Sequence, residues 1–331
     1  MRPGEEPRRA RRAAVAAVLG VGIALGVAGV PALAPPRTAE AQDLGHKVLG
    51  TLGLRAGAAP VPGVAVVDKL LLYSAGTLVD GRGRTVPVPF DLDVFANLVG
   101  VQGAVRVPLL RATYAATIGV PVARVRGTFG GAGGGGGGDG PRPEVNLDKL
   151  GLADVFVEPL RLGWTPGRAE IVVGYAFYAP RTEFQPGPRG SVSRGQWTHQ
   201  FSLGSTLYAD GARTWHLSAL ASYEWNGKKL GADITRGDDL QIQGGVGKTI
   251  ARIVDVGLVG YAQWQVRDNS GAALPEGLRA LRDRTCGVGG EVAVGIPWIR
   301  GGVRARYAAD VAVRARPRGS IVIVELLLKP F

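Results

Sequence analysis

The sequence predicts an all-β fold: a closed, antiparallel transmembrane β-barrel of about twelve strands, preceded by a cleavable N-terminal signal peptide. Three observations predict it. Apolar and polar side chains alternate with a period of two along most of the chain after residue 61. Long and short connections alternate between the predicted strands. The first residues have the composition of an export signal.

The composition of the 331 residues agrees with this fold and argues against several others. The 52 glycines follow no Gly-X-Y period, so the chain is not collagen-like. The single cysteine, Cys286, excludes an intramolecular disulfide framework and a multi-cysteine metal site. The formal net charge is +12, but the arginines are scattered and no basic helix or aromatic stripe accompanies them. We therefore expect no nucleic-acid partner.

The N-terminus has the features of a signal peptide. Five arginines precede an uncharged apolar stretch at residues 13–34, and Ala39-Glu40-Ala41 provides a cleavage site. The alternative is an uncleaved membrane anchor, but Pro31 and several glycines interrupt the stretch, which favours cleavage. The predicted organisation has three parts: a signal peptide at residues 1–41, a periplasmic N-terminal segment or plug at residues 42–60, and the barrel at residues 61–331.

Residues 215–225 show the alternation best. One face of this predicted strand is apolar, with aromatic residues toward both ends: Trp215, Leu217, Ala219, Ala221, Tyr223 and Trp225. The other face is mostly polar: His216, Ser218, Leu220, Ser222 and Glu224. An apolar face bounded by aromatic residues is typical of a lipid-facing strand, and about ten tilted residues span the hydrocarbon core.

The same pattern predicts strands at residues 62–79, 91–103, 106–125, 152–164, 168–179, 197–209, 213–226, 238–250, 253–267, 285–296, 300–315 and 319–329. Long connections are predicted at residues 80–90, 126–151, 180–196, 227–237 and 268–284. Residues 316–318 are predicted to form a shorter connection of the same set. Brief turns are predicted near residues 103–104, 165–167, 210–212, 250–252 and 297–299. Outer-membrane barrels have short periplasmic turns and long external loops, so we expect the cell outer membrane as the location.

The last strand ends the chain at Phe331. A terminal aromatic residue resembles the signal that the barrel-assembly machinery reads, so we expect this machinery and outer-membrane lipids as partners. The apolar face of the strand, which includes Val322 and Val324, is out of phase with Phe331.

Polar residues on the faces opposite the apolar ones are predicted to line the lumen: Gln200, His216, Glu224, Gln241, Gln243, Tyr261, Gln263, Arg304, Arg306 and Asp310. Two interpretations stay open. The set can form a polar path, which Arg304 and Arg306 would bias toward anions. It can equally form an internal network of ion pairs and hydrogen bonds that fills the barrel. About twelve strands lie between the filled and the open sizes, so strand number does not decide between them.

The segment before the first strand has partial helical spacing at Leu44, Val48, Leu49 and Leu52. It can be a periplasmic tail or a plug that folds into the lumen.

Motifs that would indicate an enzyme or a cofactor are incomplete. Residues 245–249 resemble a phosphate-binding loop, but Ile242 stands where its first glycine belongs. The glycines at residues 133–138 predict a flexible loop. His216 would lie near serines and a glutamate, as in a membrane-embedded hydrolase, but no nucleophile elbow accompanies it. The histidines are too dispersed for a zinc site. We expect no catalytic, metal or cofactor site.

Four segments resemble one outer-membrane protein family: Pro62-Gly63-Val64, Tyr73-Ser74-Ala75, residues 152–164 (LADVFVEPLRLGW) and residues 174–180 (GYAFYAP). The family is named for the meta-pathway of phenol degradation, and the resemblance extends over most of residues 60–331. It implies a barrel with a signal peptide that passes hydrophobic or aromatic compounds, and it implies no catalytic residues. The expected function is therefore passage of small molecules, aromatic or hydrophobic ones included. The alternative is a closed structural or interaction barrel without transport activity.

Overall fold

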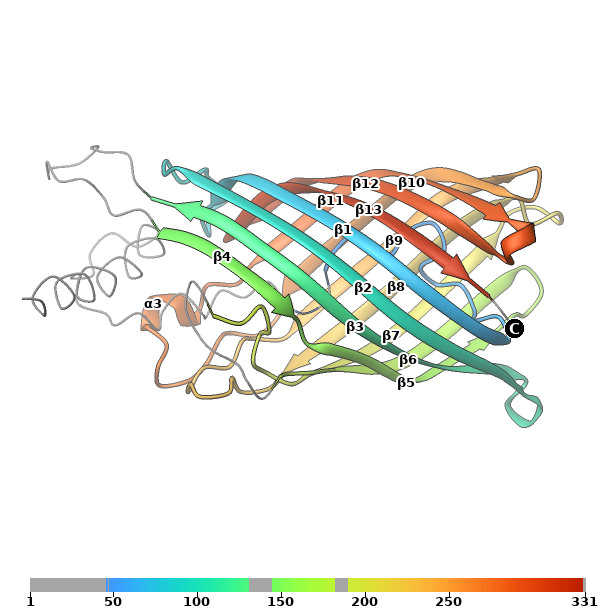
Figure 1. Ribbon diagram of the computed structural model, residues 1–331, viewed down its shortest axis with the longest axis horizontal. Coiled ribbons are helices and arrows are strands. Elements are labelled where there is room, and N and C mark those ends of the chain that lie inside the picture. The colour runs from blue at the N-terminus through green and yellow to red at the C-terminus, as the bar shows by residue number, and fades with distance from the viewer. Residues whose placement is uncertain (1–45, 47, 131–144, 182–189, 330–331) are drawn as a thin grey trace, which may run out of the picture.

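The computed structural model describes residue 46 and residues 48–130, 145–181 and 190–329. The predicted signal peptide with its cleavage site, the glycines at residues 133–138 and Phe331 lie outside the described residues. Figure 1 shows one elongated barrel whose strands are steeply tilted. No helix within the described ranges is long and apolar enough to cross a membrane.

Thirteen strand segments form one antiparallel sheet. They are β1 (Gly63–Val79), β2 (Phe90–Val107), β3 (Ala112–Phe129), β4 (Val145–Leu152), β5 (Val155–Trp164), β6 (Ala169–Ala179), β7 (Thr198–Tyr208), β8 (Trp215–Asn226), β9 (Asp239–Ile250), β10 (Val254–Gln265), β11 (Arg284–Ile296), β12 (Gly301–Arg314) and β13 (Arg316–Leu328). β1 pairs with both β2 and β13, which closes the sheet. β4 and β5 pair with β3 one after the other, so together they occupy one position in the wall. The structure is therefore the closed barrel of twelve strand positions that the alternation predicts.

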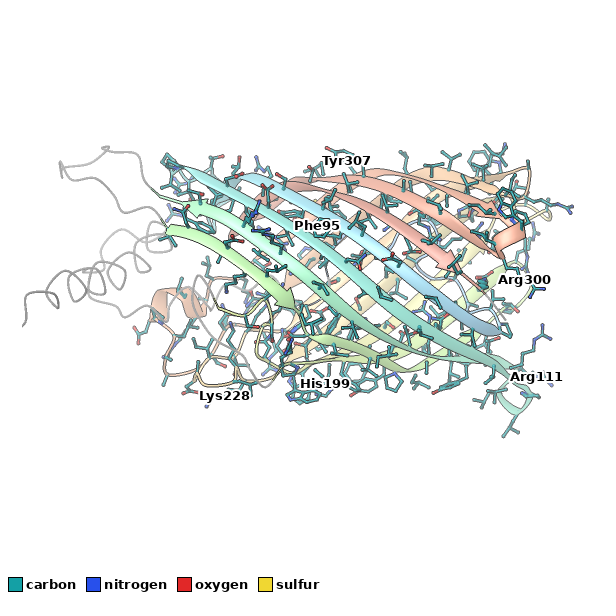
Figure 2. All side chains as sticks on the ribbon, viewed as in Figure 1. Phe95, Arg111, His199, Lys228, Arg300 and Tyr307 are labelled. Carbon is teal, nitrogen blue, oxygen red and sulfur yellow. The ribbon has the colours of Figure 1, made fainter. Side chains whose placement is uncertain are left out.

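The wall has an apolar outer face and, over β7–β12, a polar inner face. In β8, Trp215 and Trp225 are exposed on the outside, whereas His216 and Glu224 are buried on the inside. Phe95 and Tyr307 are further exposed apolar side chains, 48% and 54% exposed (Figure 2). These side chains face the lipid that surrounds such a barrel.

The two ends of the barrel differ, as predicted. Short turns at residues 108–111, 165–168, 209–214, 251–253 and 297–300 lie at one end. The longer connections that are fully described, at residues 80–89, 227–238 and 266–283, lie at the other, and the last of these contains the short helix α3 (Glu276–Arg279). The C-terminus is at the short-turn end (Figure 1). This end is therefore periplasmic.

Two predicted turns are wrong. Residues 103–104 lie within β2, because Gly103 pairs with Val64 on one side and with Ala116 on the other, so the ladder continues through them. The chain reverses only at Pro108, which has no N–H to donate. Residues 316–318 belong to β13, and the reversal occurs at Ala315, whose φ is +54°.

The strand β4 is absent from the prediction, which assigned residues 126–151 to a loop. In this region the outward side chains are charged: Arg124 and Asp148 are 3.2 Å apart, and Arg126 contacts the same carboxylate. The end of β3, beside β2, and β4, beside β3, lie toward the long-loop end of the barrel (Figure 1). Outside the hydrocarbon core, outward side chains need not be apolar, so the lipid-facing pattern does not reveal this strand.

Candidate functional site

The N-terminal segment, residue 46 and residues 48–61, lies inside the barrel between its walls (Figure 1). Four of its backbone N–H groups donate to inward side chains of β9, β11, β8 and β6: Leu52 to Gln243 (3.1 Å), Leu54 to Glu291 (3.3 Å), Gly57 to Ser218 (2.8 Å) and Ala59 to Glu170 (2.9 Å). Backbone groups removed from water need such partners. Part of the polar lining therefore serves to hold this segment in the lumen.

Leu54 is the apolar anchor of the segment and is 0% exposed. A Cβ atom added to Gly245, Gly247 or Gly257 would lie only 2.9–3.0 Å from its Cδ2 atom. The three glycines of β9 and β10 therefore form a socket for this side chain, here called the glycine socket. It accounts for the glycines that give residues 245–249 their likeness to a phosphate-binding loop.

Arg55 fastens the segment near the periplasmic end. Its guanidinium donates to Asp255 (Nε to Oδ2, 3.0 Å), to Thr249 Oγ1 (2.9 Å) and to the Tyr208 hydroxyl (2.8 Å). Asp255 is in turn the acceptor for the Thr249 hydroxyl. A guanidinium with several fixed acceptors is held in one orientation. This contact therefore both positions the segment and strengthens its binding to the barrel wall.

His46 fastens the segment toward the external end. Its Nε2 atom is 2.6 Å from Asp154 Oδ2, and its Nδ1 atom is 2.7 Å from Thr198 Oγ1. The backbone N–H donates to Glu224 at 3.3 Å, and the ring stacks on Tyr178. Asp154 lies in the break between β4 and β5, so the segment is tied to the point where the wall strand is interrupted.

Burial sets the ionisation of this pair. It lowers the pKa of His46 below the ordinary value, although the hydrogen bond with Asp154 acts in the opposite direction. Burial would raise the pKa of Asp154, but hydrogen bonds from His46 and from the Ser193 hydroxyl outweigh it and leave that pKa lowered. The docked segment therefore favours a neutral imidazole beside a carboxylate.

Arg304 and Arg306, two of the predicted lumen residues, are both paired with carboxylates. Arg306 Nε is 2.7 Å from Glu291 Oε2, and its Nη1 donates to the Gly50 carbonyl at 2.6 Å. Arg304 contacts Glu325 at 2.6 Å and Glu291 at 2.9 Å. The positive charge that the sequence assigns to an anion path is thus largely neutralised, which favours the alternative of an internal network.

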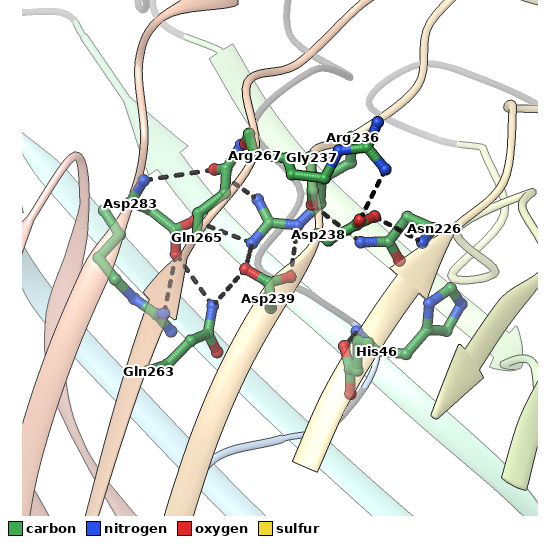
Figure 3. Close-up of polar contacts among 12 residues, drawn as sticks. His46, Asn226, Arg236, Gly237, Asp238, Asp239, Gln263, Gln265, Arg267 and Asp283 are labelled. Atoms are coloured by element: carbon green, nitrogen blue, oxygen red, sulfur yellow. Dashed lines mark hydrogen bonds and ion pairs between the residues drawn. The ribbon is translucent and has the colours of Figure 1, made fainter. Parts of the chain in front are cut away.

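A second buried network lies at the external end of β8–β11 (Figure 3). The Arg236 guanidinium, 3% exposed, lies 2.7 Å from Asp239 and 2.8 Å from Asp283. Gln263 donates to both carboxylates, and Arg316 contacts Asp283 at 3.1 Å. Arg236 belongs to the loop at residues 227–238, so this network holds that loop against the inner wall.

The remaining predicted lumen residues also lie on the inner face. Gln200, His216, Glu224, Gln241, Gln243 and Gln263 are each at most 4% exposed. The Tyr261 hydroxyl donates to Asp310 Oδ1 at 2.8 Å, and Asp310 also accepts from Thr285 at 2.9 Å. In the described part of the chain His216 has no hydrogen bond to a serine, and Ser218 instead holds the N–H of Gly57. No group of three or more His, Cys, Asp or Glu residues among the described ones is arranged to bind a metal.

The opposite inner wall is apolar, and sequence reasoning missed it. Inward side chains of β1–β4 pack together from the external end into the lumen: Leu71, Tyr73, Ala75, Phe90, Leu92, Val94, Ala96, Val125, Phe129 and Leu147. We call this set the apolar wall. Leu49 of the N-terminal segment packs at its inner end, in the cluster that contains Leu71. The lumen therefore has one apolar and one polar side.

The apolar wall was missed because the prediction took polar side chains as the sign of an inward face. Near the external end of β2 the polarity is reversed: Asp91 and Asp93 are exposed, whereas Phe90 and Leu92 are buried. The signal is visible in the alternating run from Phe90 to Val94, but it shows only that the faces differ, not which face is inside.

The comparisons with known proteins agree with this architecture. Residues 75–325 match the model of the family described as "Putative MetA-pathway of phenol degradation". No curated protein matches the chain. Among solved structures, the chain is similar to the COG4313 outer membrane channel from Pseudomonas putida F1, with a TM-score of 0.66, 13% identity, and coverage of 86% of this chain and 99% of that one.

Two more distant likenesses have TM-scores below 0.5 and carry no argument. The Pseudomonas putida toluene transporter TodX has a TM-score of 0.40 and 10% identity, over 82% of this chain and 90% of that one. The transport unit of the Escherichia coli autotransporter AIDA-I has a TM-score of 0.45 and 10% identity, over 88% and 95%. The family match spans most of the barrel, and the fold is that of the channel: the chain belongs to the phenol-degradation MetA-pathway family and is an outer-membrane β-barrel.

Proposed function

We propose that this barrel lets small hydrophobic or aromatic molecules cross the outer membrane, and that its N-terminal segment is the gate. The observation that carries the proposal is the two-sided lumen. An apolar wall leads from the external end to Leu49 of the N-terminal segment, and the polar inner face of β7–β12 lies on the other side of the lumen. Membership of a family described by phenol degradation supports an aromatic cargo.

The apolar wall supports a poorly water-soluble cargo. A strip of packed leucine, valine and phenylalanine side chains at the mouth offers an apolar surface to such a cargo. Burying about 100 Å² of an aromatic compound against such a strip would contribute roughly 2.5 kcal/mol. That is enough to concentrate the compound at the mouth and weak enough to release it.

The attachments of the N-terminal segment support a gate. It is held by separate side-chain contacts, namely single hydrogen bonds, the contacts of His46 and Arg55, and the packing of Leu49 and Leu54, whereas the wall is held by continuous ladders. Segments outside the continuous ladders of a fold open at a lower free energy than its core. The segment can therefore leave while the barrel stays closed.

The rival is a closed barrel without transport activity. The specific observation in its favour is the density of buried ion pairs around Arg236 and Arg306. The two experiments described next distinguish transport from a closed barrel.

The first experiment uses a chain that starts at residue 42, the predicted mature chain, hereafter called the mature chain. Its single-channel conductance in a planar bilayer is compared with that of a chain lacking residues 43–60 and of an Arg55→Gln variant. If the segment is the gate, we expect rare openings from the mature chain, more frequent ones from Arg55→Gln, and steady conductance after truncation. An exposed-loop variant, Arg82→Gln, serves as the control and should behave as the mature chain. Silence from all chains would support the closed barrel.

The second experiment tests the apolar wall. Val94→Asn places a polar group on the wall, and Val94→Ile is the matched apolar change at the same position. We expect Val94→Asn to lower the uptake rate of a neutral aromatic compound into liposomes several-fold, with Val94→Ile close to the unmodified chain. Equal rates for both variants would contradict a route along this wall.

A further inference from the structure

Every short turn at the periplasmic end carries an exposed arginine. They are Arg111 between β2 and β3, Arg168 between β5 and β6, Arg213 between β7 and β8, Arg252 between β9 and β10, and Arg300 between β11 and β12. At the sixth position of this end, directly after β13, stands Lys329, whose N–H donates to the Arg300 carbonyl. Figure 2 shows Arg111 and Arg300 at this same end. We call this set the basic rim.

Two of these turns are built alike from unrelated parts of the chain. Residues 107–111 (VPLLR) and 296–300 (IPWIR) each place a proline first in a single 3-10 turn and end on an arginine. The φ of Arg111 is +48° and that of Arg300 is +49°, and each N–H donates to the carbonyl of its proline. Glycine or asparagine would suit this left-handed position better. The arginine is therefore not explained by the backbone.

The charge of the basic rim is not balanced locally. None of its five arginines has an ion pair with a carboxylate within the described ranges of the chain. The only acidic residue of the five turns is Asp210, whose carboxylate already accepts the N–H groups of Thr214 and Trp215. At the external end, by contrast, some exposed arginines have acidic partners, such as Arg84 with Asp80 and Arg282 with Asp268.

Exposed apolar side chains stand beside these arginines. Leu109 is 93% exposed and Trp298 is 85% exposed, each within two residues of a rim arginine. Ile253, 45% exposed, directly follows Arg252. An apolar side chain next to an unpaired cation is suited to the membrane interface, where the former enters the acyl region and the latter meets the headgroups.

We propose that the basic rim binds anionic phospholipids of the periplasmic leaflet through their phosphate groups. A guanidinium matches a phosphate with two parallel hydrogen bonds, and each basic residue near an anionic membrane surface adds to the attraction. Six cations distributed around the periplasmic circumference would collect an annulus of acidic lipid and fix the height of the barrel in the membrane.

The test uses the mature chain reconstituted in nanodiscs of equal parts phosphatidylglycerol and phosphatidylcholine, with bound lipids identified by native mass spectrometry. The variant is Arg111→Asn/Arg252→Asn/Arg300→Asn, because asparagine adopts the left-handed conformation and the turns should still form. The matched control changes three exposed arginines of the external end: Arg82→Asn/Arg279→Asn/Arg314→Asn.

We expect phosphatidylglycerol to be enriched several-fold on the unmodified chain and on the control, and to fall to its bulk ratio on the rim variant. A rim variant with three lysines instead should keep most of the enrichment. No enrichment on the unmodified chain, or an undiminished one on the rim variant, would overturn the proposal. Displacement by soluble glycerol phosphate would overturn it as well, since the rim would then be a site for a free anion. Channel conductance should be unchanged in the rim variant, so this result is independent of the proposed function.

Discussion

At the residue scale, the contact between Leu54 and the glycine socket is the sharpest test of how the N-terminal segment is held. Leu54→Ala should remove about 2–4 kcal/mol of docking free energy, because the socket would be left as a cavity. The expected readout is faster proteolysis of residues 48–61 and more frequent channel openings. Leu109→Ala, at an exposed turn, is the control and should change neither. Unaltered proteolysis of Leu54→Ala would mean that the segment is held without this side chain.

Asp68 offers a second prediction at this scale. It is exposed on the outer face of β1, hydrogen-bonded to Asn97 at 2.6 Å and flanked outward by Val66 and Leu70. A lipid-facing carboxylate is destabilising, so Asp68→Leu should raise the free energy of unfolding in lipid by about 1–3 kcal/mol. Denaturant titration in liposomes measures this change in the free energy of unfolding. Asp93→Leu, in the region where outward side chains are charged, should give no such gain.

Single residues also show what the sequence could and could not predict. Alternation assigns His216 and Arg306 to the same side of their strands as their buried neighbours, because successive residues of a strand point to opposite faces. It could not show that Arg306 meets Glu291, since β11 and β12 must first pair in their observed register. The socket for Leu54 likewise depends on three glycines of two strands and a residue far away in the chain.

At the element scale, the N-terminal segment should respond to pH through His46. Its pKa is lowered in the docked state, so docking is fully favourable above the ordinary value of about 6.5 and weakens as pH falls toward the lowered value. The groups that face it are Asp154, Glu224, Arg194 and Tyr178. Asp154, whose pKa is also lowered, adds a further loss only below about pH 4.

We therefore expect the open probability of the mature chain to rise when pH falls from neutral to about 5, the range in which an ordinary histidine takes up its proton. His46→Gln can keep a hydrogen bond to Asp154 without titrating, and its open probability should vary little over that range. Planar-bilayer recordings at several pH values measure both chains. A pH response that His46→Gln retains in full would assign the effect to another group.

Strands whose outward side chains face lipid were predicted most accurately, because lipid requires those side chains to be apolar. β8 and β10 span the apolar layer with one apolar face, and their predicted bounds are nearly those observed. β4 was not predicted because it has polar outward residues, such as Asp148, and therefore lacks a continuous apolar face. The turn after β2 was misplaced because Gly103 and Ala104 look like a turn locally, while the ladders on both sides carry the strand on to Val107.

At the scale of the whole molecule, the barrel and its contents are held by separate sets of interactions. The pairing of β1 with β13 closes the wall without using any residue before Gly63. A chain lacking residues 43–60 should therefore fold to the same barrel. Circular dichroism and heat-modifiable migration on a gel are expected to match those of the mature chain. A truncated chain that fails to fold would make the segment part of the core and would remove it as a gate.

The truncated barrel should also select cations, although the sequence alone suggests a bias toward anions. Arg304 and Arg306 keep their carboxylate partners when the segment is absent, so they offer little net positive charge. Asp255, in contrast, loses the Arg55 guanidinium, and Glu170 loses the N–H of Ala59. Two inward carboxylates are then exposed to the open path near its periplasmic end, and charges lining a pore determine which ions it admits.

Reversal potentials across a potassium chloride gradient measure this selectivity. We expect the truncated chain to prefer potassium, and the preference to be largely lost when Asp255→Asn and Glu170→Gln are added to the truncation. Restoring the segment with Arg55 intact should suppress both the current and the preference, because the same guanidinium that fastens the segment neutralises Asp255. A truncated chain that prefers chloride would show that arginines, rather than these carboxylates, dominate the open lumen.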